Sequence, residues 1–93
     1  MPAPEVINDA IIECLRLSWN RDVEERITDA YGSEVTNEVK KLYEYAVRRP
    51  VDWTRETYGQ ATTRVAEEIG EAYPFLTAKA VERLARCFWY VWR

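Results

Sequence analysis

Hydrophobic residues recur along this chain at the spacing of an α-helix. In each of five segments they recur mostly three or four positions apart, a spacing that lines one helix face. The five apolar stripes are Ile7, Ile11, Cys14 and Leu15; Val23, Ile27, Ala30 and Tyr31; Val35, Val39, Leu42, Tyr43 and Ala46; Tyr58, Ala61, Val65, Ile69 and Ala72; and Val81, Leu84, Phe88 and Trp92. The pattern predicts an all-α fold, a compact bundle of about five helices joined by short turns.

Glycine and capping residues mark the predicted helix ends. Gly32 is expected to end the second helix in a left-handed conformation, and Ser33 to cap the third. Asp52 or Thr54 is expected to cap the fourth helix, and Thr77 the fifth.

At 93 residues the chain is expected to form one helical domain. The domain comprises an N-terminal helix at about 5–19, a helical hairpin at about 21–49 and a second hairpin at about 53–92. A shift of 42 residues places the segment VEERITDAYG on VAEEIGEAYP without a gap, and the register continues into the following helices. We interpret this as a pseudo-repeat of two helical hairpins that pack together, with the N-terminal helix covering an exposed side.

In each predicted hairpin the first helix is acidic and the second is basic. Residues 1–31 carry three positive and seven negative groups, and residues 51–74 carry two and five. Residues 32–50 carry four positive and three negative groups, and residues 75–93 carry four and one. The net charge of -3 argues against a surface built throughout to hold phosphate, but it leaves room for a local basic patch.

Nothing in the sequence indicates catalysis. Histidine is absent, and no dinucleotide-binding, P-loop, nucleophile-elbow or zinc-protease motif occurs. Two pairs of carboxylates have i, i+4 spacing, Glu25 with Asp29 and Glu67 with Glu71, but each follows an inward apolar residue by two places and should face solvent. We therefore expect a non-catalytic protein with no cofactor and no bound metal.

The sequence favours a cytoplasmic protein that does not enter a membrane. No N-terminal segment has the pattern of a secretion signal, and the apolar run AIIECLRL is too short and too charged to span a bilayer. Cys14 and Cys87 have no second thiol near them in sequence, so we expect both to be reduced and buried.

The segment RCFWYVWR, residues 86–93, contains four aromatic residues. Phe88 and Trp92 lie on the inward stripe of the last helix, whereas Trp89 and Tyr90 do not. Tryptophan, tyrosine and arginine are enriched at the centres of protein interfaces. The candidate interface residues are therefore Trp89, Tyr90, Trp92, Arg86 and Arg93. In the alternative, Trp89 packs under the first helix and Tyr90 shields an arginine stem.

Basic residues form a line on the last helix. Lys79, Arg83, Arg86 and Arg93 lie within about 40° of one direction at the rotation of an α-helix, with Tyr90 among them. The line is either a solvated helix face or a nucleic-acid contact made by Lys79, Arg83 and Arg86.

The segment from VAEEIG to TAKAVERLAR resembles a helix-turn-helix unit. Ala66 and Gly70 resemble the A-x-x-x-G of that family's first helix, and Thr77, Val81 and Arg83 resemble positions of its recognition helix. The resemblance covers about 20 residues and implies DNA binding. The connection EAYPFL is longer than the tight turn of that family and carries a proline.

The sequence thus predicts a small helical protein-protein interaction module that forms a homodimer or binds another protein. The alternative is a helix-turn-helix protein that binds DNA and regulates transcription. A third hypothesis, an acidic immunity or antitoxin-like inhibitor, rests on size and charge alone.

Overall fold

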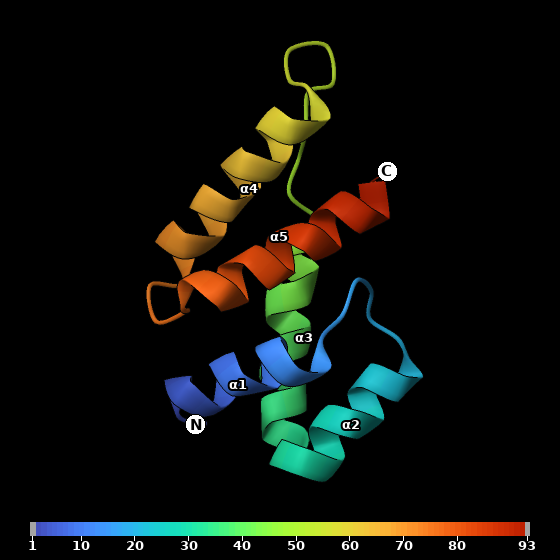
Figure 1. The fold of residues 1–93 in the computed structure, drawn as a ribbon, viewed down its shortest axis with the longest axis vertical. Coiled ribbons are helices and arrows are strands. Elements are labelled where there is room, and N and C mark those ends of the chain that lie inside the picture. Colours follow the sequence, from blue (N-terminus) through green and yellow to red (C-terminus); the bar gives the residue numbers. More distant parts are fainter. Residues whose placement is uncertain (1, 93) are drawn as a thin grey trace.

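The computed structural model describes residues 2–92 and confirms the all-α prediction (Figure 1). Within this range the chain forms five α-helices and no strand. The helices are α1 (Pro4–Cys14), α2 (Arg21–Tyr31), α3 (Ser33–Val47), α4 (Tyr58–Ala72) and α5 (Ala78–Trp92). No helix of the described range combines the length and the apolar character that a bilayer crossing requires.

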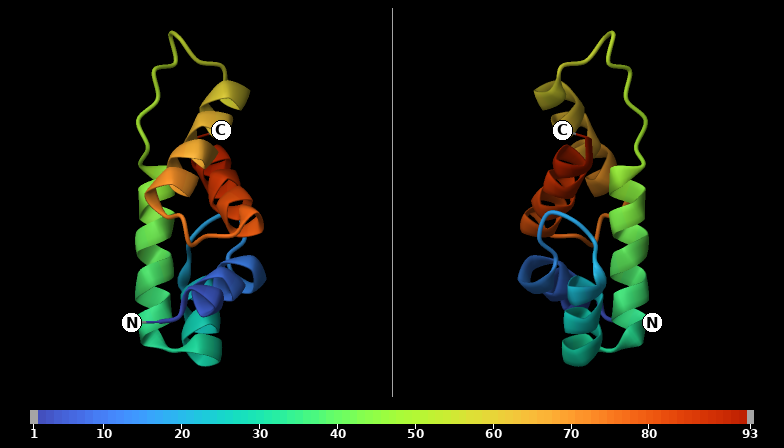
Figure 2. Two further views of the ribbon diagram at one scale, coloured as in Figure 1. Left: turned by 90° about the vertical axis from the view of Figure 1, so that its left-hand side faces the viewer. Right: turned by 90° about the vertical axis from the view of Figure 1, so that its right-hand side faces the viewer.

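Helix α5 lies at the centre of an elongated molecule that measures 42 × 26 × 16 Å. It contacts α1, α3 and α4, and α3 runs behind it along much of the long axis (Figures 1 and 2). Helix α1 packs against α2, α3 and α5, so it joins the two halves and does not merely cover one side. Within the described residues α2 contacts neither α4 nor α5.

Most residues of the predicted apolar stripes form the core or pack against it, but the half-buried Tyr58 does neither. The fully buried side chains at the centre of the core include Ile11, Leu15, Ile27, Val39, Val65, Ile69, Leu84, Cys87 and Phe88. The small residues Ala30 and Ala72 are exposed. The expectation that Trp92 faces the core is wrong, because 42% of its surface is exposed where the last turn of α5 passes the end of α3.

Helix α1 ends at Cys14, five residues before the predicted end. Leu15 has extended backbone torsions (φ -77°, ψ 125°), although its side chain is fully buried. Residues 15–20 form the connection to α2, and the Asn20 side chain caps α2 by accepting the backbone N–H of Val23 at 3.0 Å. The extended torsions at Leu15 end the helix there, so a helix through residue 19 is incompatible with them.

Gly32 joins α2 directly to α3. Its φ of 97° belongs to the positive region that glycine adopts without strain, as the sequence predicts. The expected cap at Ser33 is wrong, because Ser33 is already the first helical residue and no side chain caps α3. Thr77 does cap α5, with its hydroxyl accepting the N–H of Ala80 at 3.3 Å.

Helix α4 begins later than predicted. Asp52 and Thr54 bond to each other in a turn, and neither caps the helix. The cap is Thr57, whose hydroxyl accepts the N–H of Gln60 at 3.2 Å while the Gln60 side chain accepts the N–H of Thr57 at 2.9 Å. This reciprocal pair is a capping box, and it satisfies two backbone donors at once.

The 42-residue repeat stays a prediction. Ile27 and Ile69 are both fully buried, and Val23 and Val65 are buried as well. The connections differ, however, because a single glycine joins α2 to α3, whereas residues 73–77 join α4 to α5. Burial at matched positions also follows from helical spacing alone, so it does not decide the question.

Candidate functional site

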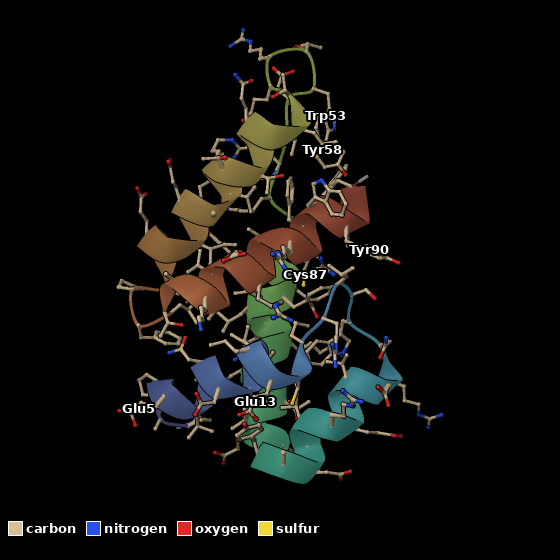
Figure 3. The ribbon with its side chains drawn as sticks, viewed as in Figure 1. Glu5, Glu13, Trp53, Tyr58, Cys87 and Tyr90 are labelled. Atoms are coloured by element: carbon tan, nitrogen blue, oxygen red, sulfur yellow. The ribbon has the colours of Figure 1, made fainter. Side chains whose placement is uncertain are left out.

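Three exposed tryptophans gather at the end of the molecule where α4 begins and α5 ends. Trp53 is 44% exposed, Trp89 41% and Trp92 42%. The ring centroid of Trp53 lies 6.1 Å from that of Trp92 and 5.3 Å from that of Tyr58, which in turn lies 6.3 Å from Trp89. Figure 3 shows Trp53 and Tyr58 together beside this end of α5. We call Trp53, Tyr58, Trp89 and Trp92 the tryptophan patch.

Backbone hydrogen bonds fix the tryptophan patch in place. The Tyr58 hydroxyl donates to the backbone oxygen of Trp89 at 2.7 Å, and the Trp92 indole donates to the backbone oxygen of Val47 at 2.9 Å. The first bond gives a carbonyl of the last turn of α5 a partner on α4. The last turn of α5 is thereby tied to both α4 and α3, so the rings are exposed but held.

The tryptophan patch is large for an 11.0 kDa protein. With roughly 250 Å² for a whole tryptophan side chain, the three exposed fractions amount to about 300 Å², the size at which exposed apolar patches on monomers are often functional. Val91, which is 48% exposed, follows in the same turn of α5. Asp52 and Arg55 lie on either side of Trp53 in the chain, with their charged atoms 3.6 Å apart.

The sequence did not indicate Trp53 as part of this surface. It is the only aromatic residue in a polar connection between α3 and α4, and the two other tryptophans of the patch come from α5, more than thirty positions along the chain. A tryptophan isolated in a polar turn is a weak signal, and only the packing of α4 on α5 brings it to Trp89 and Trp92.

The remaining predicted interface residues do not share this surface. Arg86 and the half-buried Tyr90 line a different pocket, and Tyr90 projects from the far side of the end of α5 in Figure 3. Arg93 lies outside the described residues.

The pocket beside Arg86 has a volume of about 490 Å³ and lies between α2, the connection at 15–20 and α5. Four arginines line it, and we call it the basic pocket: Arg16, Arg26, Arg83 and Arg86. The Arg83 guanidinium donates to the backbone oxygen of Leu15 at 2.9 Å. Sequence reasoning found Arg83 and Arg86, but not the two arginines that other segments bring to them.

Two of these arginines are also paired with carboxylates. Arg26 lies 3.4 Å from Asp22, and Arg86 lies 3.1 Å from Glu82. The exposed Arg16 side chain makes no hydrogen bond or ion pair to the described part of the chain.

Lys79, the third candidate for nucleic-acid contact, is exposed and does not line the basic pocket. It lies in the first turn of α5, the turn that Thr77 caps. In the structure, Arg83 and Arg86 therefore lie with Arg16 and Arg26 in the basic pocket, and not with Lys79.

Both cysteines are buried and reduced, as predicted. Burial raises the pKa of the Cys87 thiol to about 12, and the positive charge of Arg83 opposes this rise. A thiol with such a pKa stays protonated near neutral pH and is a poor nucleophile. Between residues 2 and 92 no three side chains of aspartate, glutamate or cysteine cluster as a metal site would require, and the four carboxylates with i, i+4 spacing are exposed.

No family model, curated protein or solved structure matches the chain. The tryptophan patch and the basic pocket are the surface features from which a function can be inferred.

Proposed function

We propose that the protein is a small, non-catalytic, cytoplasmic interaction module that forms a homodimer through the tryptophan patch. One observation carries the proposal: three tryptophans from two segments are each more than 40% exposed and lie in ring contact with one another or with Tyr58, while hydrogen bonds from Tyr58 and Trp92 tie the last turn of α5 to α4 and α3. Because the rings are already ordered, a partner pays little conformational entropy to bind them.

The exposed rings supply apolar area that a dimer would bury. About 300 Å² from each copy, at about 25 cal/mol per Å², gives about 15 kcal/mol of apolar burial for the pair. Association costs about 4–15 kcal/mol. The difference is compatible with a Kd near 1 μM, which corresponds to about 8 kcal/mol.

The charges around the tryptophan patch favour a second copy of the chain as the partner. Asp52 and Arg55 flank Trp53, so the rim carries both signs within one short turn. A two-fold axis through such a rim places the positive group of each copy near the negative group of the other. Each charge then gains a second partner across the contact, in addition to the ion pair within its own copy.

Sedimentation velocity of the wild type and of Trp89→Ala at about 100 μM tests the proposal. The substitution removes one anchor of about 2 kcal/mol from each copy, so the dimer should weaken by about 4 kcal/mol, or about a thousandfold in Kd. The backbone oxygen that Tyr58 binds remains in the variant.

Phe75→Ala is the matched control, since Phe75 is 40% exposed but lies in the connection between α4 and α5. It should dimerise like the wild type. A wild type that sediments as a monomer, or a Phe75→Ala variant that dissociates as readily as Trp89→Ala, would refute the proposal.

The helix-turn-helix alternative has less support. Helix α5 contacts three other helices, which leaves little of its surface to enter a groove of DNA, and residues 73–77 replace a tight turn. A gel shift with mixed duplex DNA distinguishes the two functions. Lys79→Glu with Arg86→Glu should not alter the weak binding of a protein module, whereas it should abolish the salt-dependent complex of a DNA-binding regulator. No described contact bears on an immunity or antitoxin-like role.

A further inference from the structure

The basic pocket has no part in the proposed dimer, and we propose that it binds a small molecule carrying a phosphate monoester. In Figure 1 the connection at 15–20 passes between the start of α2 and the end of α5, two helices that do not pack on each other. The space between them, about 490 Å³, falls within the usual range for a small-molecule site.

The charge of the basic pocket matches a phosphate dianion. Its four arginines are offset by Asp22 in the lining and by Glu82, which pairs with Arg86. Four positive and two negative groups leave a local charge of +2 in a protein whose net charge is -3. A phosphate monoester carries a charge of about -2 near neutral pH and offers three acceptor oxygens.

Arginine is the side chain best suited to this ligand, because its planar guanidinium donates two parallel hydrogen bonds to phosphate oxygens. Arg83 is already held by the backbone oxygen of Leu15, so its position needs no rearrangement. Arg16 is exposed and has no partner among the described residues, so its donors are available. Arg16 and Arg83 form no ion pair with a carboxylate of the described residues, so a bound phosphate would supply the negative charge that opposes them.

The other residues that line the basic pocket indicate which organic group the phosphate monoester carries. The first turn of α2 reaches the pocket through Asn20, Asp22 and Val23, and the positive end of the helix dipole adds to the attraction for an anion. Leu17, Val23 and Tyr90 supply apolar and aromatic surface beside the arginines. We therefore expect an organic group on the phosphate, and an aromatic one suits Tyr90.

Phenyl phosphate is the probe for this site, with titrations followed by two-dimensional NMR of the backbone amides. We expect saturable shifts confined to residues 15–26 and 83–90, with a Kd below about 1 mM and weaker binding of inorganic phosphate. Arg16→Gln removes a charge-assisted hydrogen bond without disturbing an internal contact, and should weaken phenyl phosphate by about tenfold.

Lys79→Gln is the matched control, because it removes one positive charge from α5 outside the pocket. It should change the Kd by less than about twofold, since exposed charges at a distance are screened. Repeating the titration on Trp89→Ala separates the two proposals, because the pocket should bind equally well in a monomer.

Three results would overturn the inference. The first is an absence of saturable shifts up to about 10 mM phenyl phosphate. The second is an equal loss of affinity in Lys79→Gln and Arg16→Gln, which would mean general attraction between opposite charges. The third is tighter binding of short duplex DNA than of phenyl phosphate at the same salt concentration, which would indicate a nucleic-acid surface instead.

Discussion

Asn8 provides the sharpest test of how α1 is joined to the rest of the fold. Its side chain is 95% buried, with only 5% of its surface exposed. The amide nitrogen donates to the backbone oxygens of Pro4 and Phe75, both at 3.0 Å, and the amide oxygen accepts the N–H of Thr77 at 2.9 Å. One side chain thereby links α1 to the connection between α4 and α5, almost seventy positions away. We predict that Asn8→Ala destabilises the whole domain.

The size of the effect follows from the groups that lose their partner. Alanine leaves the Phe75 oxygen and the Thr77 N–H without the amide, at about 0.5–1.5 kcal/mol for each lost hydrogen bond and more where water cannot replace the amide. The Pro4 oxygen costs less, because it lies in the first turn of α1 and can accept a bond within the helix. We therefore expect a loss of about 3 kcal/mol, out of roughly 5–14 kcal/mol for a domain of this length. The corresponding fall in Tm is about 15 °C.

Urea unfolding followed by circular dichroism measures this loss, with Asn37→Ala as the matched control. Asn37 is exposed in the interior of α3, so its replacement should change the free energy of unfolding by less than about 0.5 kcal/mol. The reasoning would be refuted if the free energies of unfolding of Asn8→Ala and Asn37→Ala differed by less than about 1 kcal/mol. Water would then bond to the backbone of Phe75 and Thr77 as well as Asn8 does.

Two further predictions concern the backbone and the ion pairs. Gly32→Ala should lower the free energy of unfolding by about 1 kcal/mol or more, because φ is positive at this position. No atom lies within 4 Å of the added carbon, so the backbone torsion alone accounts for the loss. Gly70→Ala inside α4 should instead raise the free energy of unfolding by up to about 1 kcal/mol. Thermal melts that rank the two glycine variants in the reverse order would contradict this. Arg64→Met should lower the Tm more than Arg21→Met, because Arg64 bonds to two carboxylates and to a backbone oxygen, while Arg21 makes one exposed pair. The hydrogen bond from Arg64 lowers the pKa of Glu56 in the folded protein. The stabilisation is therefore present above the unfolded pKa of Glu56 and is lost as the pH falls. Thermal melts below about pH 4 should show a smaller difference in Tm between wild type and Arg64→Met.

The helices could be predicted from the sequence because apolar spacing reports burial directly. The ends of the helices were harder to predict, although the sequence contains capping residues that mark two of them. Residues 15–20 read LRLSWN, which alternates apolar and polar residues as an extended segment does, and Asn20 closes that segment as a cap. Thr57 and Gln60 have the spacing of a capping box, whereas the prediction of Asp52 or Thr54 weighed residue type alone.

The candidate sites could be predicted only in part. Helical rotation places Arg83 and Arg86 on one face, but nothing local shows that Arg16 and Arg26 will face them across the pocket. Trp92 has the spacing of a core residue, yet α3 ends before it can cover the indole. Both outcomes depend on how helices cross, which periodicity within one helix does not specify.

The central position of α5 has a consequence for synthesis on the ribosome. Helices α1, α3 and α4 all pack against α5, which follows them in the chain, so their apolar faces lack a partner until it emerges. At about 5–20 residues per second, the fifteen residues of α5 take about 1–3 s to translate. During that interval the nascent chain presents the surface that chaperones bind, and a nonsense codon before residue 78 leaves a product that quality-control proteases should remove.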